Sequence, residues 1–134
     1  MKFTIIGEPQ GKQRPRHARG VVYTPKETKA YERAVAQEFH KAFPDWKPSS
    51  RPICLSIIAY TVPPNSTSKK RFTDMVAGLI HPTKKPDADN IAKIIMDALN
   101  GVAYEDDRQV VELMVRKFFQ TRRMSMFLSM SCDL

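Results

Sequence analysis

The chain has 134 residues, of which 42% are hydrophobic, and it carries 22 Lys and Arg against 14 Asp and Glu, a formal net charge of +8. This length and apolar content predict one domain, residues 1–134, with a single core. Because no apolar run is long enough to span a membrane and the first residues lack a signal-peptide pattern, we expect a soluble, cytoplasmic protein with no membrane partner.

The cysteine and histidine content argues against a disulfide or a zinc site. Cys54 and Cys132 are far apart in the sequence, and each lies in an apolar, strand-like run where buried thiols are common. The histidines, His17, His40 and His81, show no metal-ligand spacing with one another or with the cysteines. We expect neither type of site.

The amino-terminal part of the chain predicts two strands, a basic loop and a helix. Lys2 to Ile6 and Val21 to Tyr23 have strand-like composition, and the loop from Gly7 to Gly20 between them is too rich in Gly and Pro to be helical. Thr24 to Glu27 then offers an N-cap, a proline at the first helical position and a capping box. The apolar face of the helix that follows, which ends before Pro44, consists of Tyr31, Ala34, Val35, Phe39, Ala42 and Phe43.

The middle of the chain predicts a central strand and a short helix. Ile53 to Val62 is dominated by β-branched and aromatic residues, and Pro63-Pro64 ends it. Thr67 to Leu79 is a candidate helix whose first turn, Ser68 to Arg71, is basic. Since positive charge there opposes the helix dipole, this turn suggests an external anionic partner.

The most regular pattern begins at Asp89, where apolar residues recur at helical spacing until Asn100-Gly101. Two strands then follow, Gln109 to Phe119 and Met124 to Cys132, which are joined by a turn at residues 121–123 and predict a closing hairpin. The expected fold class is α/β, more specifically α+β, with a small mixed sheet packed with about three helices. The apolar face of the third helix consists of Ile91, Ile94, Ile95, Ala98 and Leu99.

The acidic residues are concentrated in one segment of this basic chain. Residues 87–107 hold six acids against one base, Lys93, a formal −5, so the rest of the chain carries +13. Carboxylates hold Mg²⁺ or Mn²⁺, whereas Lys and Arg neutralise phosphates, so the contrast indicates metal chemistry on a polyanion. The six acids are Asp87, Asp89, Asp97, Glu105, Asp106 and Asp107.

Two acidic pairs form the candidate metal site. Asp87 and Asp89 stand just before the helix, where the chain is free to direct both at one cation. Asp106 and Asp107 follow the helix stop, and we expect a helix leading out and a strand leading back to bring both pairs together. Lys93 lies one turn after Asp89 on the same side of the helix. Its ammonium is therefore a candidate for stabilising charge on a scissile phosphate or orienting the attacking water.

Other interpretations of these acids stay open. An Asp-x-Asp before a helix is often only an N-cap, and an Asp-Asp pair in a turn is often only solvated. Asp97, one turn beyond Lys93, is expected to have a structural role in which it pairs with Lys93 or with a loop amide. An EF-hand is excluded because Ile91 and Ala92 occupy positions that need an acid or Asn and a glycine. A nucleotide-sugar transferase would need a larger sheet, so we expect no nucleotide cofactor.

Three basic clusters are candidate contacts for DNA phosphates. They lie in the first loop, at the start of the second predicted helix and just before the acidic segment. A basic surface that merely keeps the protein soluble is the alternative, although the first loop is too constrained by Gly and Pro for a flexible tail. The candidates are Lys12, Arg14, Arg16, Lys69, Lys70, Arg71, Lys84 and Lys85.

Several of these motifs together resemble the RusA family of Holliday junction resolvases. The central one is Lys85-Pro86-Asp87-Ala88-Asp89-Asn90-Ile91-Ala92-Lys93, which is followed by Asp97-Ala98-Leu99-Asn100-Gly101-Val102 and Asp106-Asp107-Arg108-Gln109-Val110. The stretch from Gly7 to Arg16 and the helix start at Tyr23-Thr24-Pro25 are also similar to that family. The resemblance covers most of the chain.

The resemblance implies a small homodimer that binds four-way junction DNA and, with Mg²⁺ or in its place Mn²⁺, cuts two opposed strands symmetrically in DNA recombination and repair. The family's essential metal-site aspartates correspond to Asp87, Asp89 and Asp107, and its essential lysine corresponds to Lys93. Asp106 neighbours the site and would assist metal binding. Family members often come from prophages, but no residue here fixes the origin.

Two other functions compete with junction resolution. The first is a metal-dependent nuclease or nucleotide hydrolase that acts on other substrates, and a comparison of four-way, flap, duplex and mononucleotide substrates would distinguish it. The second is a non-catalytic DNA-binding module whose acids are only caps and turns. Calorimetric titration with Mg²⁺ and Mn²⁺ separates that module from an enzyme.

Overall fold

The computed structural model describes residues 1–121 and 123–131, so Arg122 of the predicted turn and Cys132 lie outside the described residues. The described part forms one α+β unit with a four-stranded mixed sheet, a separate two-stranded sheet and three α-helices. The elements in chain order are β1 (Lys2–Ile6), β2 (Arg16–Ala18), β3 (Val21–Tyr23), α1 (Lys26–Ala42), β4 (Ile53–Thr61), α2 (Lys69–Val76), α3 (Ala88–Leu99), the 3₁₀ turn η1 (Asp107–Gln109), β5 (Val110–Phe119) and β6 (Ser125–Ser131).

The large sheet has the order β1-β6-β4-β5, with β1 and β5 at its edges. β6 runs antiparallel to both β1 and β4, whereas β4 and β5 are parallel and pair Ile57 with Val115. β4 therefore occupies the centre, as its nearly continuous β-branched and aromatic sequence predicts. The parallel pair requires a crossover, and the segment that contains α2 and α3 supplies it.

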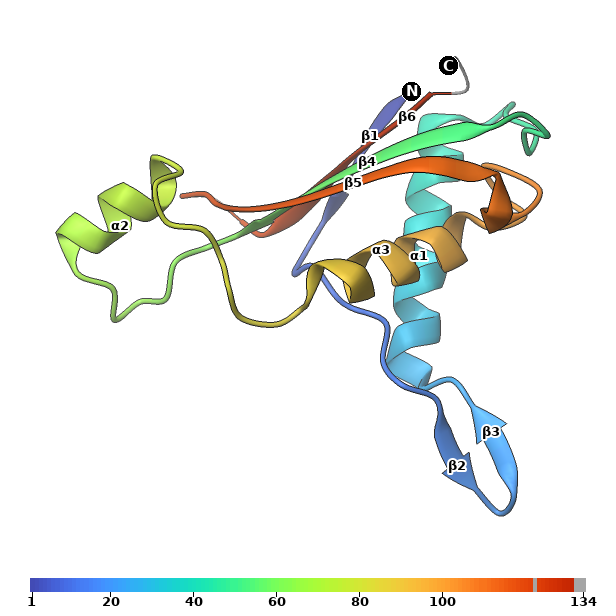
Figure 1. Ribbon diagram of the computed structural model, residues 1–134, viewed down its shortest axis with the longest axis horizontal. Coiled ribbons are helices and arrows are strands. Elements are labelled where there is room, and N and C mark those ends of the chain that lie inside the picture. Colours follow the sequence, from blue (N-terminus) through green and yellow to red (C-terminus); the bar gives the residue numbers. More distant parts are fainter. Residues whose placement is uncertain (122, 132–134) are drawn as a thin grey trace.

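Helices α1 and α3 pack together against one face of this sheet (Figure 1). Alternate residues of β1, β4 and β6 point into the core, and the predicted apolar face of α3 is fully buried. In α1 the prediction was only partly right, because Val35 and Phe39 are buried while Ala34 and Ala42 are exposed. The predicted capping box at Thr24 is also wrong, since Pro25 is the extended N-cap residue and no side chain caps the helix.

The predicted closing hairpin between β5 and β6 is wrong, because β4 lies between these two strands. After β5 the chain crosses the end of β4, where the amide of Gln120 donates to the carbonyl of Thr61 at 2.9 Å. The alternation within β6 is as expected, with Met126, Leu128 and Met130 buried. A period-two pattern identifies a strand and its buried face, but it does not specify the neighbouring strand.

Two parts of the chain extend away from the sheet. The β2–β3 hairpin projects from the start of α1, and α2 lies beyond the opposite end of the sheet (Figure 1). The strand β2 falls inside the segment that the sequence predicts as loop. No helix among the described residues is long and apolar enough to cross a membrane.

Candidate active site

Asp87 and Asp89 stand at the amino-terminal end of α3. Asp87 is the N-cap residue, with extended backbone (φ −71°, ψ 150°), and its carbonyl accepts from the amide of Ile91 at 3.0 Å. Its carboxylate makes no capping hydrogen bond, and among the described residues neither exposed carboxylate has a hydrogen-bond or ion-pair partner. Because the next turn of α3 is buried, two uncommitted carboxylates are held on a rigid support.

Lys93 is exposed one turn further along α3, on the same side as Asp89. Within residues 1–121 and 123–131 its ammonium has no ion-pair partner. The alternative in which Asp97 pairs with Lys93 is wrong. Instead, the carboxylate of Asp97 contacts the ammonium of Lys12 at 2.8 Å. Lys93 therefore remains available to an external anion.

The loop between β1 and β2 braces the start of α3. The amide of Lys12 donates to the carbonyl of Asn90 at 2.8 Å. At Gly11 a Cβ atom would lie 2.9 Å from the Cβ of Asn90 and 3.1 Å from that of Pro86, which is closer than side chains pack. Glycine is therefore required where this loop passes the segment that carries Asp87.

The side chain of Lys12 strengthens this brace. It is only 15% exposed, and its ammonium contacts Glu32 of α1 at 2.5 Å as well as Asp97 of α3. Burial alone would lower the pKa of Lys12, but the two carboxylates outweigh burial and raise it. No sequence pattern predicts this role, because a lysine in a basic loop has the same pattern whether it contacts phosphate or carboxylates. Its predicted phosphate contact stays a prediction.

Asp106 and Asp107 lie past the carboxyl-terminal end of α3, at the turn η1. One carboxylate oxygen of Asp106 accepts from the amide and Nε of Arg108, both at 2.9 Å, and the other accepts from its Nη2 at 3.0 Å. These bonds to Arg108 lower the pKa of Asp106 to about 2. The side chain of Gln109 completes a capping box with Asp106. Asp106 is therefore already committed to local structure, whereas Asp107 is half-buried beside it.

The expected meeting of the two acidic pairs within one chain is wrong. They flank a helix of 12 residues, which at ~1.5 Å per residue is about 18 Å long. Figure 1 shows β5 starting beyond the carboxyl-terminal end of α3, and Asp107 lies in η1 just before that start. The second acidic pair therefore lies at the opposite end of α3 from Asp87 and Asp89. Across the described ranges no group of three or more His, Cys, Asp or Glu is placed to hold a metal ion.

The predicted DNA contacts occupy separate exposed surfaces. Arg14 and Arg16 belong to the arm formed by the β2–β3 hairpin and its approach. The first turn of α2 follows Ser68, whose hydroxyl accepts from the amide of Arg71 at 3.4 Å, and the pair Lys84-Lys85 lies before α3. Arg71, Lys84 and Lys85 line one cavity together with Pro86, the residue before Asp87. The exposed residues are Arg14, Arg16, Lys69, Lys70, Arg71, Lys84 and Lys85.

Comparison with known proteins agrees with the motifs. A family model described as endodeoxyribonuclease RusA matches residues 7–126. The chain is also 38% identical over 125 residues to the uncharacterized protein YqaN of Bacillus subtilis (strain 168), and the alignment covers 89% of this chain and 87% of that protein. Both the brace at Gly11 and the acidic residues lie inside the matched region. The chain therefore belongs to the RusA family of endodeoxyribonucleases.

Proposed function

We propose that this protein is a Mg²⁺-dependent, structure-selective endonuclease that resolves four-way (Holliday) junctions by cutting two opposed strands, in DNA recombination and repair. The observation that carries the proposal is the pair of exposed, uncommitted carboxylates of Asp87 and Asp89 beside Lys93, in a chain of the RusA family with net charge +8. Hydrolysis would leave a 3′-hydroxyl and a 5′-phosphate.

The donor set suits a hard divalent cation. Mg²⁺ takes oxygen ligands and uses one or two carboxylates together with waters and phosphate oxygens, and Mn²⁺ would substitute for it. Asp87, Asp89 and Asp107 would hold the ion. When bound, it supplies Lewis acidity, which activates water and offsets charge on the scissile phosphate. Lys93 would stabilise the charge that develops on the phosphate oxygens.

A homodimer is proposed because, within one chain, the two acidic pairs lie at opposite ends of α3. Among the described residues, the edge strand β5 pairs only with β4, and it exposes the apolar residues Val111 (59% exposed), Leu113 (43%) and Met114 (39%). If the β5 edges of two copies met antiparallel, the beginning of each β5 would lie near the end of the other. Asp107 of a second copy would then complete the site that Asp87 and Asp89 begin. A two-fold dimer also matches a two-fold junction.

Cleavage of one labelled synthetic four-way junction, with Mg²⁺ and then with a chelator, tests the activity. We expect symmetric cuts in opposed strands that the chelator abolishes, and flap, duplex and mononucleotide substrates should react much more slowly. Equal cleavage of all substrates would favour a less selective nuclease. If the protein binds the junction but neither cleaves it nor shows any heat of Mg²⁺ or Mn²⁺ binding, a non-catalytic DNA-binding module would be favoured.

Mixing two inactive variants tests the shared site. Asp89→Asn and Asp107→Asn should each abolish cleavage as pure proteins. A mixed dimer would contain one site with both substitutions and one site with neither, and the second site would be intact. Co-refolded protein should therefore regain nicking of one strand. If each site were built within one chain, mixing would restore nothing. Recovery therefore distinguishes a site shared by two chains from a site within one.

A further inference from the structure

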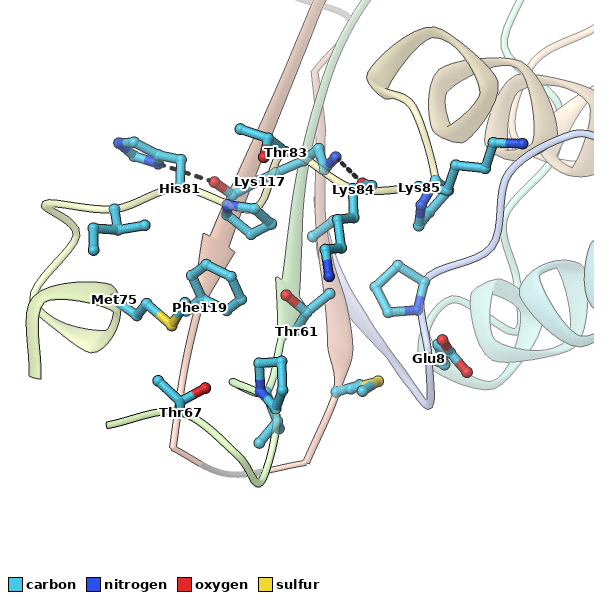
Figure 2. Close-up of a pocket in the computed structure, with 18 of the residues that line it drawn as sticks. Glu8, Thr61, Thr67, Met75, His81, Thr83, Lys84, Lys85, Lys117 and Phe119 are labelled. Atoms are coloured by element: carbon cyan, nitrogen blue, oxygen red, sulfur yellow. Dashed lines mark hydrogen bonds between the residues drawn. The ribbon is translucent and has the colours of Figure 1, made fainter. Parts of the chain in front are cut away.

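A cavity of about 700 Å³ lies between α2, the carboxyl-terminal ends of β4 and β5, and the segment before α3 (Figure 2). Met75, Ile91 and Phe119 are among the apolar residues that line it, while Arg71 and Lys84 contribute positive charge. Its volume is in the range of pockets for small organic groups. The cavity could therefore bind a flat or compact apolar group, and its basic side chains could bind an anionic group attached to that ligand.

Two details place polar groups inside this cavity. The hydroxyl oxygen of Thr61 is buried and makes no hydrogen bond to any described residue. Figure 2 shows the side chain of Lys84 entering the cavity above Thr61, whereas the Lys85 side chain points away. The ammonium of Lys117, on β5, donates to the carbonyl of Lys84 at 2.8 Å. This bond holds the backbone of Lys84 against β5. The wall of the cavity therefore contains an unsatisfied hydroxyl oxygen, below the end of the Lys84 side chain.

The cavity adjoins the candidate metal ligands along the chain. Pro86 lines it, and Asp87 is the next residue. A nucleotide whose base entered the cavity would therefore have its neighbouring phosphodiester close to Asp87 and Asp89. Arg71, at the end of the first turn of α2, faces the same opening and would hold a flanking phosphate.

We propose that the cavity receives one unstacked nucleobase from the branch point of the DNA substrate, with its phosphate held by Arg71 and Lys84. The proposal rests on the endonuclease function proposed above and deepens it. Removing a base from the stack costs least where stacking is already interrupted, as it is across the branch point of an open four-way junction. Base capture thereby provides a physical source of selectivity for junctions over duplex. A segment of a second copy is a poorer occupant, since each copy carries net charge +8 and would bring cations to a cationic opening.

Photocrosslinking tests the occupant. A four-way junction with 5-iododeoxyuridine at each branch-point position in turn is bound to the full-length protein in chelator and irradiated, and mass spectrometry identifies the crosslinked peptides. We expect one branch-point position to crosslink to cavity residues such as Phe119 or Met75. Crosslinks confined to the β2–β3 hairpin, in a protein that binds and cuts junctions, would overturn the cavity proposal alone. Failure to bind or cut any junction would overturn both proposals.

A pair of charge-matched variants separates the cavity from general attraction to DNA. Lys84→Gln and Lys69→Gln each remove one positive charge, but only Lys84 lines the cavity. We expect Lys84→Gln to reduce the cavity crosslink roughly tenfold, whereas Lys69→Gln should leave its yield per bound junction unchanged. Equal reductions would overturn the proposal. It would also be overturned if the Lys84→Gln protein sedimented as a smaller species than the wild type, because the cavity would then be occupied by a second copy of the chain. Thermal melting of both variants checks that each is folded.

Discussion

The two acidic pairs that flank α3 look alike in sequence, but they differ in what their carboxylates contact. Asp106 gives both oxygens to Arg108 and caps η1, while Asp87 and Asp89 have no such partners among the described residues. A carboxylate that already accepts several hydrogen bonds gains less from a cation than one that has none. The carboxylates of Asp87 and Asp89 are therefore free to bind the proposed metal ion, whereas Asp106 stabilises the turn that contains Asp107.

The largest expected effect follows from neutralising the first pair. Asp87→Asn should reduce junction cleavage on the order of a thousandfold, because a metal ligand is lost. Junction binding should be kept or tightened, since one negative charge facing phosphate has gone. Cleavage and gel-shift assays on one synthetic junction measure the two effects, and Asp45→Asn on an exposed loop is the matched control. A fully active Asp87→Asn protein would remove the metal site.

The same substitution in the second pair sharpens the contrast. Asp106→Asn removes the charge that faces Arg108 but leaves an oxygen that can still accept from the Arg108 amide. We expect cleavage to fall by less than about tenfold, because Asp106 acts through the turn rather than on the phosphate. If Asp106→Asn were as inactive as Asp87→Asn, the two pairs would not differ in the way described.

Lys93→Ala tests the uncommitted lysine beside the first pair. The expected result is a single-turnover cleavage rate about a hundredfold lower, because a charge that stabilises the transition state has been removed. The melting temperature should barely change, since Lys93 is exposed. An unchanged single-turnover rate at saturating enzyme would contradict a catalytic role for Lys93.

Lys12→Met tests the brace that holds α3, which carries the first pair. Removing the ammonium leaves Glu32 and Asp97 facing each other at a site where the lysine is 15% exposed. We expect the free energy of unfolding to fall by roughly 1–3 kcal/mol, as measured by urea denaturation. Lys41→Met is the control, because it breaks an exposed pair with Glu38 that contributes at most about 0.5 kcal/mol. Equal losses in both variants would mean that Lys12 is an ordinary surface lysine.

Periodicity was enough to identify the elements that support the site. Every buried position predicted in α3 is buried, because only one face of a 3.6-residue repeat can meet the sheet. Strand order was not predictable in this way, since β6 has the same alternation whether its neighbour is β4 or β5. The position of β4 between them depends on contacts between distant parts of the chain.

The exposure of Asp87, Asp89 and Lys93 was predictable from the sequence, but the geometry of the candidate site was not. The pattern around Asp87 and Lys93 identified exposed residues on one side of a helix, because helical spacing fixes their relative direction. The distance between the acidic pairs depends on where β5 begins, and the sequence alone did not fix this. The contacts of Gly11 with Asn90 and the open cavity beside Thr61 both arise from packing between distant segments, for which local pattern has no signal.

The smallest expected effect concerns the ionisation of Asp106. In the folded protein, hydrogen bonds from Arg108 lower its pKa to about 2, whereas the unfolded chain has the ordinary value of 3.8. The stabilising contribution of Asp106 is therefore complete above pH 3.8 and is lost as the pH falls through about 2.

Arg108→Ala should raise the pKa of Asp106 toward 3.8, though not fully, because the backbone amide of residue 108 still donates. Carboxyl-carbon NMR titration measures this shift. Both groups are exposed enough for salt to screen the pair, so any difference between the variant and wild type should be largest at low ionic strength. The ionisation of Asp106 should differ mainly between about pH 2 and pH 3.8, whereas the small loss of stability in the variant should be seen above pH 3.8. An unchanged pKa in Arg108→Ala would mean that Asp106 is not held by Arg108, and its carboxylate would then be as available to a cation as those of Asp87 and Asp89.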